Sequence, residues 1–91
     1  MAKTIELIGN LANALAQTKA TIKAPTVAEL LNQNKLKNLR GKEYSTSTKS
    51  RGIFKVIRAA YNFFKNKGDE TTAYNIANSI VSNANKYPWK K

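Results

Sequence analysis

The sequence predicts an all-α fold, a small four-helix orthogonal bundle in which residues 1–91 form a single domain. Three observations support this prediction. Apolar residues recur at the spacing of a helix face in four segments, helix-capping residues and glycines separate those segments, and no segment shows the alternation and hairpin turns of strands. A chain of 91 residues suits one domain, and a hydrophobic content of 42% is enough for a core and too high for a disordered chain.

The first two helices are expected over residues 4–17 and from residue 26 toward Gly41. In the first, Gly9 weakens the helix by about 1 kcal/mol relative to alanine. Thr26 and Glu29 have the spacing of a capping box, in which each side chain bonds the backbone amide of the other, so Thr26 is the expected N-cap of the second helix. Residues 32–34 are poor helix formers and favour a break there. Gly41 stands where a left-handed C-terminal cap belongs.

The third helix is predicted over residues 49–67, and a polar linker, residues 42–50, separates it from the second helix. Gly68 is expected to end it. This is the longest predicted helix, and it carries all three phenylalanines of the chain. We therefore expect it to form the centre of the core.

Asp69 is the expected N-cap of the fourth helix, and Glu70 in its first turn favours the positive end of the helix dipole. Apolar residues at helical spacing continue this helix to Ala84. Residues 85–91 then form a basic aromatic tail, which either closes the core or offers rings for stacking on a single strand.

The charge balance indicates a polyanionic partner. Sixteen lysines and arginines oppose five acidic residues, which gives a formal net charge of +11. Most of these cations are lysines, whose flexible point charges suit phosphate contacts better than base reading. A coding bias toward lysine explains part of that excess, but it does not explain why acidic residues are so few. We expect nucleic acid as the partner, and DNA rather than RNA.

A stripe of cations on the third helix is the first candidate site. Arg51, Lys55, Arg58, Asn62 and Lys65 follow one another at steps of four and three residues, so they share one face of the helix. No acidic residue lies within this helix, and like charges at these spacings repel by a few tenths of a kcal/mol per pair. Either this stripe is the solvated back of an amphipathic helix, or a partner neutralises it. We favour the partner.

Two smaller groups of residues extend this candidate site. The first lies at the start of the third helix, where free backbone amides also favour phosphate, and consists of Ser47, Thr48 and Lys49. The second lies at the end of the second helix, where Lys35 precedes the candidate site residues Lys37, Arg40 and Lys42. The dipole of the second helix alone would favour cations there. If the two helices pack as neighbours, however, all these residues form one basic surface.

Residues 26–65 resemble a helix-turn-helix unit in their pattern. The first turns from Thr26 to Leu31 are similar to those of many such units, and the basic helix after Ser47 would be the recognition helix. The connection from Gly41 to Thr46 is longer than the usual turn of three or four residues. Binding to phosphates needs less geometry and is the simpler expectation.

Catalysis is not expected. The chain has no cysteine and no histidine, so the usual nucleophile and general base are missing, and its five carboxylates form no convincing metal-binding cluster. We expect no cofactor and no metal. The sequence contains no apolar run of membrane-spanning length, and polar residues interrupt the N-terminal stretch, so a cytoplasmic location is expected.

Two other kinds of function remain open. An acidic protein surface is an alternative partner, as for a viral or mobile-element accessory protein that inhibits a nuclease or joins a nucleoprotein complex. A structural assembly subunit is the second alternative, because the alanine-rich faces of the first and fourth helices could pair in a homodimer.

Overall fold

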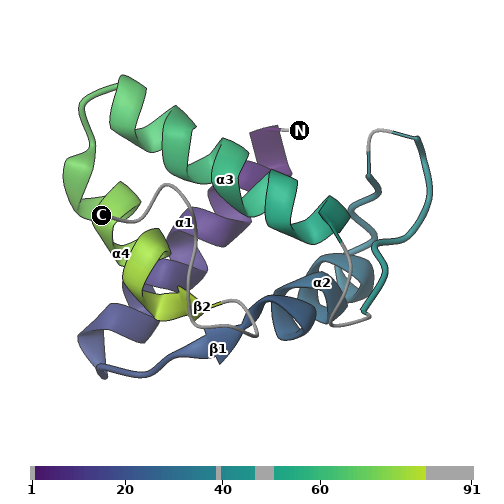
Figure 1. The fold of residues 1–91 in the computed structure, drawn as a ribbon, viewed down its shortest axis with the longest axis horizontal. Helices are drawn as coiled ribbons and strands as arrows, with labels where there is room; N and C mark the ends of the chain where they lie inside the picture. The colour runs from purple at the N-terminus through teal and green to yellow at the C-terminus, as the bar shows by residue number, and fades with distance from the viewer. Residues whose placement is uncertain (1, 39, 47–50, 82–91) are drawn as a thin grey trace.

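The structure, a computed structural model, describes residues 2–38, 40–46 and 51–81. These residues form four helices and two short strands, and the predicted helical bundle is confirmed (Figure 1). The elements in chain order are α1 (Ala2–Gln17), β1 (Ile22–Lys23), α2 (Ala24–Gln33), α3 (Arg51–Asn66), α4 (Glu70–Ser79) and β2 (Ile80–Val81).

Helices α1, α3 and α4 pack against one another, and α2 packs against α3 and the two strands (Figure 1). The fully buried large side chains are mostly isoleucines: Ile8, Ile53, Ile57, Ile76 and Ile80, together with Val27 and Leu31. Burial of each such side chain contributes about 1.5–3 kcal/mol. Five of the seven lie outside α3, so all the elements together supply this core.

The three phenylalanines of α3 do not all enter the core. Phe64 is buried, Phe54 is half-buried, and Phe63 is 46% exposed. Consecutive residues lie 100° apart on a helix, so the rings of Phe63 and Phe64 leave α3 in different directions, and of these two only Phe64 lies on the buried side.

Gly9 is a point of close approach between α1 and the helices α3 and α4. A β-carbon at this position would lie 2.6 Å from two ring carbons of Phe64 and 3.2 Å from Cγ2 of Thr72. The absence of a side chain therefore lets Phe64 of α3 and Thr72 of α4 reach the backbone of α1. The loss of helix propensity at Gly9 is offset by this packing.

The predicted capping box of α2 is wrong. The helix begins at Ala24, and its N-cap residue Lys23 makes no side-chain capping hydrogen bond. Thr26 therefore lies inside the first turn and Glu29 is exposed. Two constraints move the start toward the N-terminus. Lys23 is extended because it belongs to β1, and Pro25 has the fixed φ that suits a first helical turn.

The predicted cap at Gly41 is also wrong, because α2 ends at Gln33 in the asparagine-rich segment. Lys35 takes the left-handed position with a φ of 57°. The Leu36 amide then donates to the Leu31 carbonyl at 3.0 Å, which closes the helix end. Gly41 has the expected positive φ, 76°, but in a separate loop.

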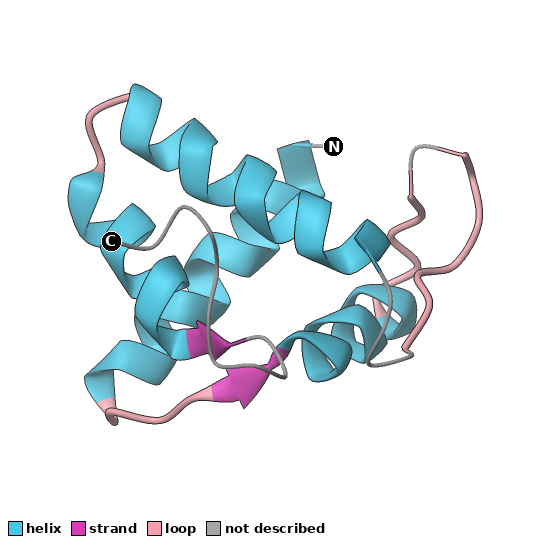
Figure 2. Ribbon diagram, viewed as in Figure 1, coloured by secondary structure: helices cyan, strands magenta, loops and turns pink. Residues whose placement is uncertain are grey.

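The fourth helix is shorter than predicted. It ends at Ser79, and Ile80 is extended. Ile80 and Val81 pair in parallel with Ile22 and Lys23, so the prediction that the chain holds no sheet is wrong at this point (Figure 2). Two β-branched residues at the end of a helix favour this change. The predicted continuation to Ala84 and the tail lie outside the described residues.

The junction between α3 and α4 has the predicted caps. Gly68 ends α3 with a φ of 91°, and a carboxylate oxygen of Asp69 accepts from the Thr72 amide at 3.1 Å. Asp69 also accepts from the Thr72 hydroxyl at 2.7 Å, and that hydroxyl accepts from the side chain of Asn13 at 3.1 Å. The Asn75 side chain donates to the Asn13 side-chain oxygen at 2.8 Å. A polar network thus joins α1 to the start of α4.

Parts of the alanine-rich faces of α1 and α4 pack within the chain, whereas Ala14 of α1 is exposed. Ala12 of α1 is fully buried, and Ala73 and Ala77 of α4 are 3% and 5% exposed, because α1 and α4 pack on each other. These alanines are therefore not available to a second copy. None of the described helices is long and apolar enough to cross a membrane.

Replacing Gly9 by alanine should lower the free energy of unfolding by about 1–2 kcal/mol, because overpacking against Phe64 exceeds the gain in helix propensity. Urea unfolding followed by circular dichroism measures this change. Asn10→Ala, at the exposed neighbouring position, is the control and should cause no loss. A Gly9→Ala variant as stable as the parent would contradict the predicted close packing.

The pH dependence of stability should involve Asp69. Hydrogen bonds from the Thr72 hydroxyl and backbone amide lower the pKa of the Asp69 carboxyl below its usual 3.8. The stability that the ionised Asp69 adds to the fold is therefore fully present above pH 3.8, and it is lost as the pH falls through the lowered pKa. Asp69→Asn keeps a capping oxygen but cannot titrate, so its stability should fall less between about pH 6 and pH 2. Urea unfolding at both pH values measures this, with exposed Glu43→Gln as control. Equal losses in Asp69→Asn and the parent would refute it.

Candidate nucleic-acid interface

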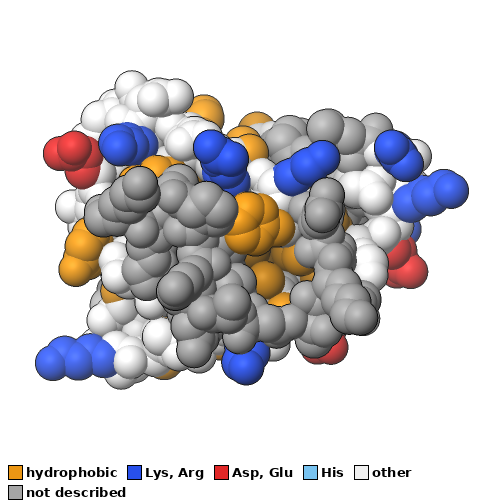
Figure 3. Space-filling view, in the orientation of Figure 1, with side chains coloured by type: hydrophobic (Ala, Val, Ile, Leu, Met, Phe, Trp, Pro, Cys, Tyr) orange, Lys and Arg blue, Asp and Glu red, His pale blue; other side chains and the backbone are white. Residues whose placement is uncertain are grey.

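The predicted stripe of α3 is exposed. Lys55, Arg58, Asn62 and Lys65 all lie on the solvent side of the helix, opposite the face that enters the core. Arg51 begins the helix, but its side chain lies outside the described part of the structure. Figure 3 shows Lys and Arg side chains spread along the edge formed by α3, with hydrophobic side chains among them. We call Lys55, Arg58, Asn62 and Lys65 the basic face.

The opposite side of α3 explains how the basic face is held in place. Ile57 and Ala60 are fully buried, and Ile53 is 2% exposed. Repulsion between like charges costs a few tenths of a kcal/mol per pair, whereas each buried large side chain contributes more than 1 kcal/mol. Packing therefore fixes the helix and displays its cations together, without requiring acidic residues on the same helix.

Hydrogen bonds hold Asn38 close to residues 40–42, which carry further cations. The Asn38 side-chain oxygen accepts from the backbone amides of Arg40 at 2.8 Å and Lys42 at 3.0 Å. The backbone amide of Asn38 donates to the backbone carbonyl of Lys42 at 2.8 Å, and the positive φ of Gly41 permits the tight turn. We call residue 38 and residues 40–42 the basic loop. Arg40 and Lys42 are exposed on it.

Hydrogen bonds between Asn32 and Tyr44 connect the segment that carries the basic loop to α2. The Asn32 side-chain amide donates to the Tyr44 carbonyl at 2.9 Å, and its oxygen accepts from the Tyr44 amide at 2.8 Å. Tyr44 is only 5% exposed, and burial raises the pKa of its phenol. Its hydroxyl donates to the Lys37 carbonyl at 3.4 Å. Residues 42–50, expected to be a polar linker, thus include a core residue that holds the loop beside α3.

A hollow of about 420 Å³ lies where the basic loop meets α3. Its lining residues are Asn38, Arg40, Tyr44, Gly52, Lys55, Val56 and Ala59. Arg40 of the loop and Lys55 of the basic face line the same hollow, and Gly52 and Ala59 leave room between them. The two cationic groups predicted separately from the sequence therefore meet at this point.

The other predicted site residues that the structure describes do not line this hollow. Lys37 and Lys42 are exposed on the segment that carries the basic loop, while Arg58 and Lys65 continue along α3. Lys65 also places its ammonium 5.7 Å from the centre of the Tyr61 ring. The predicted residues at the start of α3, namely Ser47, Thr48 and Lys49, lie outside the described residues.

The helix-turn-helix arrangement expected for residues 26–65 is not formed by α2 and α3. Because α2 ends at Gln33 and α3 begins at Arg51, the connection between them is far longer than the three or four residues of that motif. The described part of this connection includes the basic loop and the segment that contains Tyr44.

Asn38 and Asn32 build the site, and the sequence analysis did not single out either residue. For Asn38 a signal exists, because asparagine at the first position and glycine at the fourth position are typical of a tight turn, as in Asn38 to Gly41. For Asn32 the sequence holds no comparable signal, because its partner is the backbone of a residue twelve positions away.

No cluster of histidine, cysteine or carboxylate side chains that could hold a metal ion occurs in the described part of the chain. Comparison of the chain with protein-family models, curated proteins and solved structures finds no match.

Replacing Asn32 by alanine should release the basic loop. The Tyr44 backbone would lose both hydrogen bonds from this side chain, and we expect a loss of about 1–2 kcal/mol in unfolding free energy together with faster hydrogen exchange at the Tyr44 amide. Amide exchange followed by NMR measures the local effect. The exposed neighbour gives the control Gln33→Ala, which should leave the exchange unchanged. Equal protection of Tyr44 in both variants would count against this role.

Proposed function

We propose that this protein binds the phosphate backbone of a nucleic acid through the basic face of α3 and the basic loop. The observation that carries the proposal is the hollow at which Arg40 of the loop and Lys55 of the helix meet. A polyanion with regularly spaced charges is the natural complement of such a surface, since it contacts cations on both elements at once.

The binding mechanism is charge neutralisation with release of counterions. Lysine and arginine on this surface replace the cations condensed on the nucleic acid, and the released ions supply the free energy. With about five to eight phosphate contacts, the logarithm of the binding constant falls with the logarithm of salt concentration at a slope of roughly −4 to −7 on duplex DNA. DNA is the expected ligand, and RNA is compared with it in the same assay.

The variant Lys55→Glu/Arg58→Glu should bind a labelled DNA at least about tenfold more weakly than the parent and reduce the salt slope by about 2, because two phosphate contacts are lost. Fluorescence anisotropy at several salt concentrations measures both quantities. Both residues are exposed, so circular dichroism should show an intact fold.

The matched control is Lys19→Glu/Lys23→Glu, which changes the net charge by the same amount. Both lysines are exposed, and the turn into β1 lies on the opposite edge of the molecule from α3 in Figure 1. This control should retain most of the affinity and the parent salt slope. If both variants lose affinity equally, only the net charge matters and the proposed surface is wrong. Absence of parent binding at low salt would refute the function.

A further inference from the structure

A second hollow lies on the other side of the basic face, between α3 and α4. It measures about 380 Å³, within the range of roughly 300–1,000 Å³ typical of small-molecule sites. Its lining residues are Tyr61 and Lys65 of α3 and Glu70, Ala73, Tyr74, Ala77 and Asn78 of α4. Of these lining residues, Lys65 alone belongs to the phosphate-binding surface proposed above.

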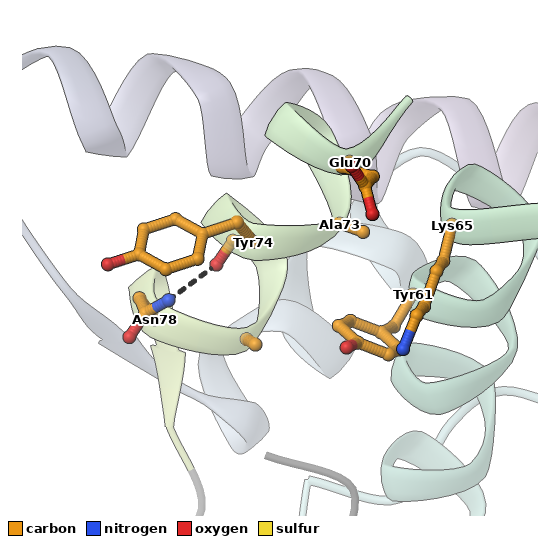
Figure 4. A pocket seen from close by; sticks show the side chains of 7 residues that line it. Tyr61, Lys65, Glu70, Ala73, Tyr74 and Asn78 are labelled. Atoms are coloured by element: carbon orange, nitrogen blue, oxygen red, sulfur yellow. Dashed lines mark hydrogen bonds between the residues drawn. The ribbon is translucent and has the colours of Figure 1, made fainter. Parts of the chain in front are cut away.

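The lining combines flat rings with a few polar groups. Figure 4 shows Tyr61 and Lys65 on one side, Tyr74 and Asn78 on the other, and Ala73 between them. Tyr74 is 68% exposed, a large value for an aromatic side chain, so its ring is available for contact. Alanine leaves space between the two sides. This lining fits a flat aromatic ligand that has hydrogen-bonding edges.

The polar groups of the rim have the chemistry to meet the edge of a base. The Asn78 side-chain amide donates to the Tyr74 carbonyl at 2.7 Å, which fixes the amide and leaves its oxygen as an acceptor. The Glu70 carboxylate is a second acceptor, and Figure 4 shows it at the rim of the hollow. Acceptors of this kind suit the amino groups of adenine and cytosine.

Lys65 connects this hollow to the basic face, because it belongs to both. Its ammonium lies 5.7 Å from the centre of the Tyr61 ring, and Arg58 follows along the same exposed side of the helix. A nucleotide strand held by phosphates on Arg58 and Lys65 would therefore have its bases within reach of the hollow. Phosphate and base would contact adjacent parts of one surface.

We propose that this hollow receives an unpaired base of a single-stranded nucleic acid, which stacks on Tyr74 while Lys65 holds the neighbouring phosphate. The proposal rests on the proposed function and names the form of nucleic acid that the surface prefers. In a duplex both faces of each base are already stacked, so its bases do not reach the ring. A single strand offers them at no cost in unpairing.

The test compares two single strands of about 12 nucleotides with the same number of phosphates, one of oligo(dA) and one whose sugars all lack bases. The parent should bind oligo(dA) more tightly. Tyr74→Ala should weaken binding to oligo(dA) by about 5- to 100-fold, the loss typical of one stacked base, and leave binding to the abasic strand unchanged. Tyr74→Phe keeps the ring and should bind oligo(dA) like the parent.

Other outcomes overturn the inference while leaving the proposed function standing. The parent could bind both strands with equal affinity, or Tyr74→Ala could lose the same affinity for both strands. The parent could also bind a duplex of the same length as tightly as oligo(dA). Lys55→Glu/Arg58→Glu should weaken binding to both strands, because it removes phosphate contacts. If the parent binds neither strand nor the duplex, the proposed function and this inference fail together. Circular dichroism of each variant confirms the fold.

Discussion

The contact between the Gly9 backbone and the ring of Phe64 sets how closely α1, α3 and α4 pack. Because no side chain separates them, α1 lies directly against α3, and Thr72 of α4 approaches the same point. Ala12 and Ala73 continue this close packing between α1 and α4. The rotation of α3 about its own axis is fixed by the same contact, and that rotation decides which residues of α3 face the solvent.

The basic face is therefore a consequence of packing on the opposite side of the helix. Ile53, Ile57 and Phe64 determine that Lys55, Arg58 and Lys65 are displayed together, despite their mutual repulsion. A polyanion that binds the folded chain removes this repulsion and also stabilises the fold by mass action. Stability and binding are thus linked on this surface, and added salt weakens both the repulsion and the attraction to the partner.

The sequence predicted the helices where periodicity and local caps agree. Gly68 and Asp69 are examples, because each acts on residues within one turn. It failed where distant residues decide the local structure. Lys23 and Ile80 are extended because their strands pair, and this pairing moves the start of α2 and the end of α4.

The same distinction applies to the candidate site. The cations of α3 could be placed on one face by their spacing alone, since helical geometry is regular. The basic loop could not be placed beside that face, because its position depends on the hydrogen bonds between Asn32 and the Tyr44 backbone. The hollow between α3 and α4 likewise requires two elements whose packing the sequence pattern does not specify.

The hydrogen bonds between α1 and α4 join residues 59 and 62 positions apart in the chain. During synthesis, α1 leaves the ribosome long before the partners that cover Ile8 and Ala12. Its apolar face therefore stays open until α3 and α4 have also been made, and forming these distant contacts requires closure of a long loop. The chain consequently completes its core in one late step, and a ribosome-bound fragment that ends before α4 would remain a target for chaperones and proteases.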